Sequence, residues 1–189
     1  NQEFCYCHYV REDKKSWQHM YKLLTDGQTS LVGKDGRQYE FLVEFDTDDF
    51  AYGIYFGCKV IFHSITGKST CTDYPQVDKE TLLAESDFLS LHCPLSDLSR
   101  DFIDAEALKK MKKSAVLINV ARGPVVNNKD LYEALKAGEI MAAGLDVIEK
   151  EPLELSNPLS ELKDSNQIII TPHLAWASVE ARTRCVEET

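Results

Sequence analysis

The stretch Ala115-Val116-Leu117-Ile118-Asn119-Val120, followed at once by Ala121-Arg122-Gly123, decides the fold class of this 189-residue chain. It is apolar except for Asn119 and stops at a glycine, which is typical of a short strand that is buried on both faces. Such strands belong to parallel sheets that are covered by helices. The segments on either side of it should therefore include helices.

The chain on both sides of this stretch alternates between strand-like and helix-like segments. Further strands are expected over Cys58–Phe62, Phe88–His92, Met141–Ile148 and Gln167–Thr171. Helices are expected over Thr81–Ala84 after an Asp78 cap, Ala105–Lys113 after an Asp104 cap, Lys129–Lys136 closed by Gly138, and Ala177–Cys185. This alternation predicts an α/β fold, with a partial doubly wound (Rossmann-like) parallel sheet.

Residues 1–54 do not share this alternation, so we separate an unassigned N-terminal segment, 1–54, from the α/β domain, 55–189. The segment contains a helix-compatible stretch, Lys14–Leu24, and a hairpin-like pair, Thr29–Val32 and Tyr39–Phe45. An exposed sheet edge invites pairing with another strand. We therefore expect Tyr39–Phe45 to cover or extend the edge of the α/β sheet.

Composition argues against several classes of function. The chain has 21 basic and 31 acidic residues, a net charge of −10, which does not suit a nucleic-acid-binding surface. Its apolar runs are far shorter than the ~20 residues that span a bilayer, so no membrane partner is expected. Six scattered cysteines indicate reduced thiols in a cytoplasmic protein. Cys5, Cys7 and His8 lack the second ligand pair that a closed zinc site requires, so no metal site is expected.

Polar groups follow the expected strands, at the edge where an open α/β sheet binds its ligands. These groups are His92-Cys93-Pro94, Arg122-Gly123, Asp146 with Glu149 and Glu151, and His173. Each alone has an ordinary structural explanation, because a lone histidine after a strand is more often structural than catalytic. Together they suit chemistry on a 2-oxo acid, since an arginine can clamp a carboxylate and a histidine can move the carbinol proton.

Residues 56–182 resemble the cofactor-binding domain of the D-isomer-specific 2-hydroxyacid dehydrogenases. The resemblance rests on the order and spacing of Phe56-Gly57-Cys58-Lys59-Val60, Leu82-Leu83-Ala84-Glu85-Ser86-Asp87, Ser90-Leu91-His92-Cys93-Pro94-Leu95, Leu117-Ile118-Asn119-Val120-Ala121-Arg122-Gly123, Gly144-Leu145-Asp146-Val147, Glu151-Pro152 and Thr171-Pro172-His173. This family reduces small 2-oxo acids with a nicotinamide cofactor, so the resemblance implies an oxidoreductase with NAD or NADP.

The resemblance also implies roles for single residues. Arg122 matches the substrate-binding arginine, His173 the acid/base histidine, and Glu151 the carboxylate that pairs with this histidine. The cofactor-binding positions are Ser64, Cys93, Pro94, Ser99, Val120, Ala121 and Asp146. The expected substrate is a small 2-oxo or 2-hydroxy acid, and a homodimer is compatible with this assignment.

The sequence departs from the family pattern in three places. The family's Gly-x-Gly-x-x-Gly turn has no counterpart between Leu31 and Tyr55, Ser64 stands where an acidic residue usually holds the adenosine ribose, and the family's substrate-binding domain has no match. Lys68 is the cation near Ser64, so the choice between NAD and NADP stays open. Two hypotheses follow: an oxidoreductase on a partial cofactor domain, or a non-catalytic relic or interaction module on the same scaffold.

Overall fold

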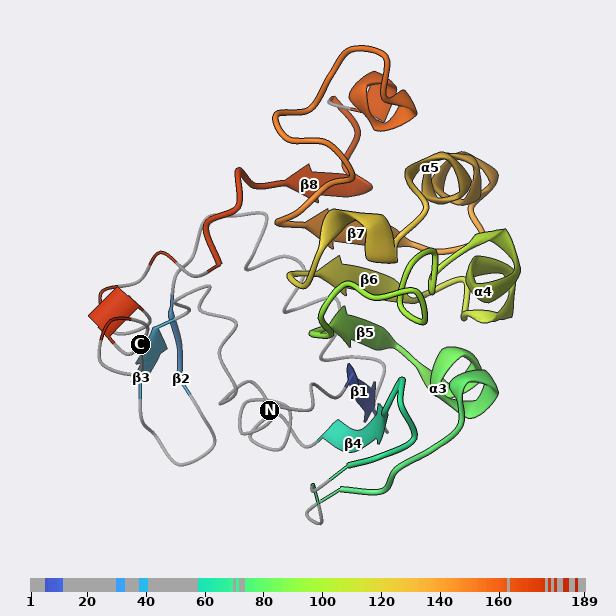
Figure 1. Cartoon of the computed structure of the whole chain (residues 1–189), viewed down its shortest axis with the longest axis vertical. Helices are drawn as coiled ribbons and strands as arrows, with labels where there is room; N and C mark the ends of the chain where they lie inside the picture. The colour runs from blue at the N-terminus through green and yellow to red at the C-terminus, as the bar shows by residue number, and fades with distance from the viewer. Residues whose placement is uncertain are drawn as a thin grey trace.

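The structure is a computed structural model that describes residues 6–11, 30–32, 38–40, 58–69, 71, 74–162 and 164–175, and positions 177, 179, 182, 183 and 186. Its main element is a six-stranded sheet (Figure 1). The strands lie in the order β4 (Cys58–His63), β1 (Tyr6–Arg11), β5 (Phe88–Leu91), β6 (Val116–Asn119), β7 (Ala142–Leu145) and β8 (Ile168–Ile170).

Strands β5, β6, β7 and β8 are adjacent and parallel, which confirms the predicted fold class. Their registers are aligned so that the last residues of the four strands, Leu91, Asn119, Leu145 and Ile170, are paired in a row across the sheet. The third of these strands is shorter than predicted, because β7 ends at Leu145 rather than at Ile148. The residues that follow the strands therefore all leave the sheet at the same edge.

The described part of the hairpin-like pair forms a sheet of its own. Tyr39–Phe45 is expected to cover or extend the main six-stranded sheet, but its described residues, Tyr39 and Glu40, belong to β3 (Gln38–Glu40). This strand pairs with β2 (Ser30–Val32) in a separate two-stranded antiparallel sheet. The predicted hairpin is thus present, and its backbone groups are used by its own two strands. Residues 41–45 lie outside the described part of the chain.

Strand β1 enters the main sheet in the place where the extension was expected. It is antiparallel to both of its neighbours, so β4 runs in the same direction as β5. In a doubly wound sheet this position belongs to a parallel strand that leads into the glycine-rich turn. The N-terminal segment therefore completes the sheet with a strand of the opposite direction.

Three helices cover the sheet as the sequence predicts. They are α3 (Lys79–Glu85), α4 (Ala105–Lys110) and α5 (Asn128–Ala137), which lie next to one another along one side of the sheet in Figure 1. Asp78 and Asp104 cap the first two, each accepting a hydrogen bond from a backbone N–H of the first turn. Gly138 ends α5 with a φ of +67°, a conformation that suits glycine.

The core lies between these helices and the sheet. Its fully buried side chains include Leu82 and Leu83 of α3, Leu108 of α4, Leu131 and Leu135 of α5, and Leu89, Leu91 and Leu117 of the sheet. Two short 3-10 turns, η1 (Gly123–Val125) and η2 (Pro158–Leu162), follow β6 and precede β8. The expected helix Lys14–Leu24 and most of the expected helix Ala177–Cys185 lie outside the described residues.

Candidate active site at the carboxyl ends of the strands

His173 and Glu151 form a pair at the edge of the sheet where strands β5 to β8 end. The Nδ1 atom of His173 lies 2.9 Å from Oε2 of Glu151, and both side chains are about 40% exposed (41% and 40%). The other carboxylate oxygen of Glu151 accepts a hydrogen bond from the backbone N–H of Ile148, at 3.3 Å. Glu151 is therefore fixed against the chain that follows β7, and it leaves the Nε2 atom of His173 as the ring nitrogen for a substrate.

Asp146, the first residue after β7, holds the loop that carries His173. One carboxylate oxygen accepts hydrogen bonds from the Thr171 hydroxyl at 2.6 Å and from the backbone N–H of Leu174 at 2.8 Å. The other accepts from the N–H of Ala175 at 2.9 Å. The N–H of His173 donates to the Asp146 carbonyl at 3.0 Å, while His173 has a φ of +57°. Hydrogen bonds to Asp146 from the residues on both sides of His173 thus hold its backbone in the left-handed conformation.

These bonds also set the ionisation of Asp146, which is only 7% exposed. Burial raises the pKa of the Asp146 carboxyl, but the hydrogen bonds from Thr171 and from the backbone outweigh it and lower the pKa below its usual value. The side chain is therefore a carboxylate at neutral pH. A carboxylate can accept all three hydrogen bonds at once, whereas a protonated carboxyl would lose part of this capacity.

Arg122 reaches the same edge from β6. Its side chain is exposed, and its Nη1 atom donates to the carbonyl of Ala121 at 2.6 Å. The fully buried Asn119 shapes this turn, because its amide donates to the Arg122 carbonyl at 3.1 Å and accepts from the Ala121 N–H at 3.1 Å. The Asn119 carbonyl accepts from the N–H of Asp146 at 2.9 Å, which joins the turn to the next strand.

Gly123 packs directly on the chain segment that leads to Glu151. A Cβ atom on Gly123 would lie 1.8 Å from the carbonyl oxygen of Ile148 and 2.5 Å from the nitrogen of Glu149. A residue with a side chain cannot occupy this position without moving the backbone. The glycine thus allows the Arg122 turn and the Glu151 segment to touch.

The positions expected at the cofactor fall into two groups. Pro94 is exposed and Val120 is half-buried, so both offer surface to a ligand at this edge. Cys93, Ala121, Ser64 and Ser99 are buried. The Ser99 hydroxyl donates to the Pro94 carbonyl at 2.7 Å and accepts from the Ser96 N–H, also at 2.7 Å. The Ser64 hydroxyl donates to the Lys68 carbonyl at 2.7 Å. Both serines therefore shape their own loops.

Two polar residues of this edge were not among the predicted sites. Asn119 organises the Arg122 turn, and its position inside an otherwise apolar strand was a signal that could have identified it. His92 is the second, because its Nε2 atom lies 2.7 Å from the Ser90 hydroxyl and burial lowers the pKa of its ring to about 4. The sequence places His92 in a polar group at the end of this strand but assigns it no role of its own.

The residues at this edge fit the nicotinamide end of a dinucleotide cofactor better than its pyrophosphate. The polar and half-buried groups beyond β5 to β8 suit the nicotinamide end. The pyrophosphate end requires a parallel strand, a glycine-rich turn and a helix N-terminus. Strand β1 is antiparallel to β5, so it ends at the opposite edge, and no glycine follows Arg11 before Gly27. The usual pyrophosphate contact is therefore not supplied by β1.

The described residues contain no group of three or more His, Cys, Asp or Glu side chains arranged to hold a metal ion. None of the helices in the described part of the chain has the length and apolar character needed to cross a bilayer.

Comparisons with known proteins agree with this geometry. Residues 52–175 match the family description "D-isomer specific 2-hydroxyacid dehydrogenase, NAD binding domain". A glyoxylate reductase of Korarchaeum cryptofilum is 48% identical over 111 residues, which cover 59% of this chain and 32% of the relative. A glycerate dehydrogenase of Methylorubrum extorquens is 50% identical over 111 residues, covering 57% of this chain and 35% of the relative. The chain thus spans about a third of the length of these curated relatives.

The same domain is found among solved structures. A D-lactate dehydrogenase with NAD⁺ from Lactobacillus jensenii superposes with a TM-score of 0.64 at 29% identity, covering 72% of this chain and 44% of that one. A D-isomer-specific 2-hydroxyacid dehydrogenase from Lactobacillus delbrueckii, in an NAD-complexed form, gives a TM-score of 0.62 at 31% identity, covering 73% and 46%.

Proposed function

Because this chain belongs to the D-isomer-specific 2-hydroxyacid dehydrogenases through their NAD-binding domain, we propose that it carries the catalytic residues of an oxidoreductase. The reaction is hydride transfer between a nicotinamide cofactor, NAD or NADP, and a small 2-oxo or 2-hydroxy acid. The observation that carries the proposal is the 2.9 Å contact between His173 and Glu151 at the edge that also presents Arg122.

Each of these three side chains has a chemical role in the proposal. Glu151 accepts a hydrogen bond from the Nδ1 atom of His173, which orients the ring and directs its Nε2 atom to the substrate. His173 then donates a proton from Nε2 to the substrate oxygen in the reductive direction and removes it in the oxidative direction. Arg122 binds the substrate carboxylate with its two-pronged guanidinium.

The cofactor supplies the hydride when it is bound, and the chain supplies position and charge. We propose that Pro94, Val120 and Ala121 border its nicotinamide end, with Cys93 and Ser99 shaping the loop beside it. Asp146 acts there by holding the His173 loop. Ser64 and Lys68 lie after β4, where an uncharged residue and a cation are compatible with either NAD or NADP.

The proposal extends to the organisation of the molecule. We propose that residues 55–189 form the cofactor domain and that residues 1–54 are a segment added to it. The reduced thiol of Cys71 supports a reducing compartment, the cytoplasm. Strand β8 lies at the end of the sheet with Ile169 68% exposed, which supports pairing with a second copy in a homodimer. Neither a membrane nor a nucleic acid is a partner in this proposal.

A second function, a non-catalytic scaffold or interaction module, is favoured by one specific observation. Strand β1 occupies the position of the parallel strand that normally leads to the pyrophosphate, and it runs in the opposite direction. Titration with NADH and NADPH, followed by fluorescence, separates the two functions. Binding of either cofactor supports the oxidoreductase, and no binding at millimolar concentration supports the scaffold.

Reduction of glyoxylate, hydroxypyruvate and pyruvate tests the catalytic assignment. His173→Ala should lower kcat by about 10²- to 10⁴-fold, the usual contribution of a general acid. Arg122→Lys should chiefly raise KM, because an ammonium cannot make the bidentate contact. Glu151→Gln should lower kcat, while Glu133→Gln, an exposed carboxylate on α5, serves as its control. Full activity in His173→Ala would refute the assignment.

A further inference from the structure

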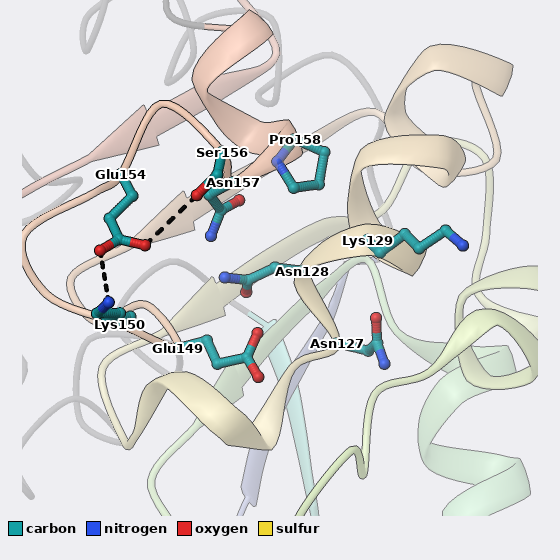
Figure 2. A pocket seen from close by; sticks show the side chains of 9 residues that line it. All are labelled: Asn127, Asn128, Lys129, Glu149, Lys150, Glu154, Ser156, Asn157 and Pro158. Atoms are coloured by element: carbon teal, nitrogen blue, oxygen red, sulfur yellow. Dashed lines mark hydrogen bonds and ion pairs between the residues drawn. The ribbon is translucent and has the colours of Figure 1, made fainter.

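A cavity of about 540 Å³ opens between the start of α5 and the loop over residues 149–158 (Figure 2). Its lining includes Asn128, Glu149 and Asn157, and it does not include Arg122, Glu151 or His173. Its volume is in the range of small-molecule sites. It is therefore a separate hollow from the proposed active site.

The inner wall of this cavity presents a hydrogen-bond donor without a partner. Asn128 is only 4% exposed, and within the described part of the chain its side-chain Nδ2 has no hydrogen-bond acceptor. Figure 2 shows the Asn128 side chain directed into the cavity, between Glu149 and Asn157. A buried donor that stays unpaired destabilises the fold, because it has lost its hydrogen bonds to water. An acceptor supplied by a ligand would remove this cost.

The start of α5 adds to the attraction for a negative group. Asn128 is the first residue of this helix, and the Asn127 side chain caps the N–H of Asp130, at 3.1 Å. The N–H groups of the first turn point out of the helix and carry its positive dipole end. An anionic group beside the Asn128 amide therefore meets both a free donor and a favourable field.

The opposite wall presents a negative charge. Lys150 and Glu154 form an ion pair at 2.5 Å, and Glu154 also accepts a hydrogen bond from the Ser156 hydroxyl. Among the described residues Glu149 has no ion-pair partner, and its carboxylate lies at the cavity near Asn128 in Figure 2. The Lys129 side chain extends away from the cavity. The site thus combines a donor for an anion with an acceptor for a cation.

We propose that this cavity binds the zwitterion of a free α-amino acid. The α-carboxylate accepts the hydrogen bond from Nδ2 of Asn128 at the start of α5, and the α-ammonium pairs with Glu149. The remaining volume lies open to solvent and accommodates the amino-acid side chain. A simple anion would leave Glu149 unpaired, and a simple cation would leave the Asn128 amide without an acceptor.

Calorimetric titration of the whole chain with glycine, L-alanine and L-glutamine tests this site. Acetate and methylamine serve as probes for each half of the zwitterion. Asn128→Leu removes the donor and keeps the number and branching of the side-chain heavy atoms, and Glu149→Gln removes the charge without changing the shape. Glu133→Gln, on the same helix but outside the cavity lining, is the matched control. Thermal unfolding of each variant is measured in parallel.

At least one amino acid should bind the unmodified chain more tightly than acetate or methylamine. Asn128→Leu and Glu149→Gln should each weaken binding on the order of tenfold, the usual effect of losing a charge-assisted hydrogen bond. Glu133→Gln should bind normally. The Tm of Asn128→Leu should be unchanged or higher, because an unpaired buried amide is replaced by an apolar group.

Three results would overturn the proposal. The first is that no amino acid binds at millimolar concentration. The second is binding of acetate or methylamine as tight as that of the amino acids, which would indicate a site for a single charge, or unchanged binding in either variant, which would place the amino-acid site elsewhere. The third is a marked fall in the Tm of Asn128→Leu, because it would show that the Asn128 amide has a partner within the protein.

Discussion

His92 lies directly after β5 with its ring largely removed from water, and this burial lowers its pKa to about 4. The ordinary value for an exposed histidine, near 6.5, applies to the unfolded chain. Between these two values the unfolded state binds the proton and the folded state does not. The contribution of His92 to the free energy of unfolding is therefore largest above about pH 6.5, and it falls as the pH decreases toward 4.

We predict that His92→Asn removes much of this pH dependence. The wild-type chain should lose up to about 3 kcal/mol between pH 6.5 and pH 4 from this group alone. Asparagine cannot titrate, and it keeps a polar group near the Ser90 hydroxyl. Urea unfolding at several pH values in this window measures the effect. Parallel curves for the two proteins would contradict the prediction.

Asp146 changes its protonation at a lower pH than His92, and its role is to hold the His173 loop. Its pKa is lowered, so its contribution to stability is complete above the unfolded value, near 3.8, and is lost as the pH falls through the lower folded value. We predict that Asp146→Asn lowers the free energy of unfolding at pH 7 by about 1–3 kcal/mol, since an amide cannot accept all three hydrogen bonds. Denaturant unfolding at pH 7 measures this loss, which should shrink below about pH 4. Equal stability at pH 7 would show that the carboxylate does not hold the loop.

At the scale of elements, the η1 turn can pack on the segment after β7 because residue 123 is a glycine and has no Cβ atom. We predict that Gly123→Ala destabilises the protein by about 1–3 kcal/mol or more, because the new Cβ would overlap the backbone of Ile148. It should also lower activity, because this contact lies between Arg122 and Glu151. Thermal unfolding and the reduction assay measure the two effects.

Gly144, within β7, provides the matched control. A Cβ at Gly144 has no heavy atom within 4 Å, so Gly144→Ala should change stability by no more than about 1 kcal/mol. If both substitutions had the same small effect, the close approach of the two segments would not constrain the structure.

At the scale of the whole molecule, the sheet ends at β8, whose outward-facing Ile169 is 68% exposed. An apolar edge strand of this kind pairs readily with another chain. In the homodimer proposed above, Ile169→Lys should favour the monomer, because a charge on the edge disfavours strand pairing. Light scattering over a range of concentrations measures the change. A dimer of unchanged mass would place the interface elsewhere.

The sequence by itself determined the elements and the chemistry of this protein. Apolar runs defined β5 to β8, and the Asp78, Asp104 and Gly138 caps located the helices to within a few residues. The residues that follow the strands, together with the family resemblance, led to the proposal that Arg122, Glu151 and His173 act as one set. These features depend on residues close in sequence, since burial periodicity and capping act within a few positions. They could therefore be read without the tertiary structure.

Only the tertiary structure decided which segments meet. It placed Tyr6–Arg11 inside the main sheet, it paired Gln38–Glu40 with Ser30–Val32 in a separate sheet, and it joined Asp146 to the His173 loop. It also showed the contact at Gly123 and the unpaired amide of Asn128. Each of these depends on groups that are far apart along the chain. Their free energy comes from long-range strand pairing, burial and hydrogen bonds, which local sequence patterns do not encode.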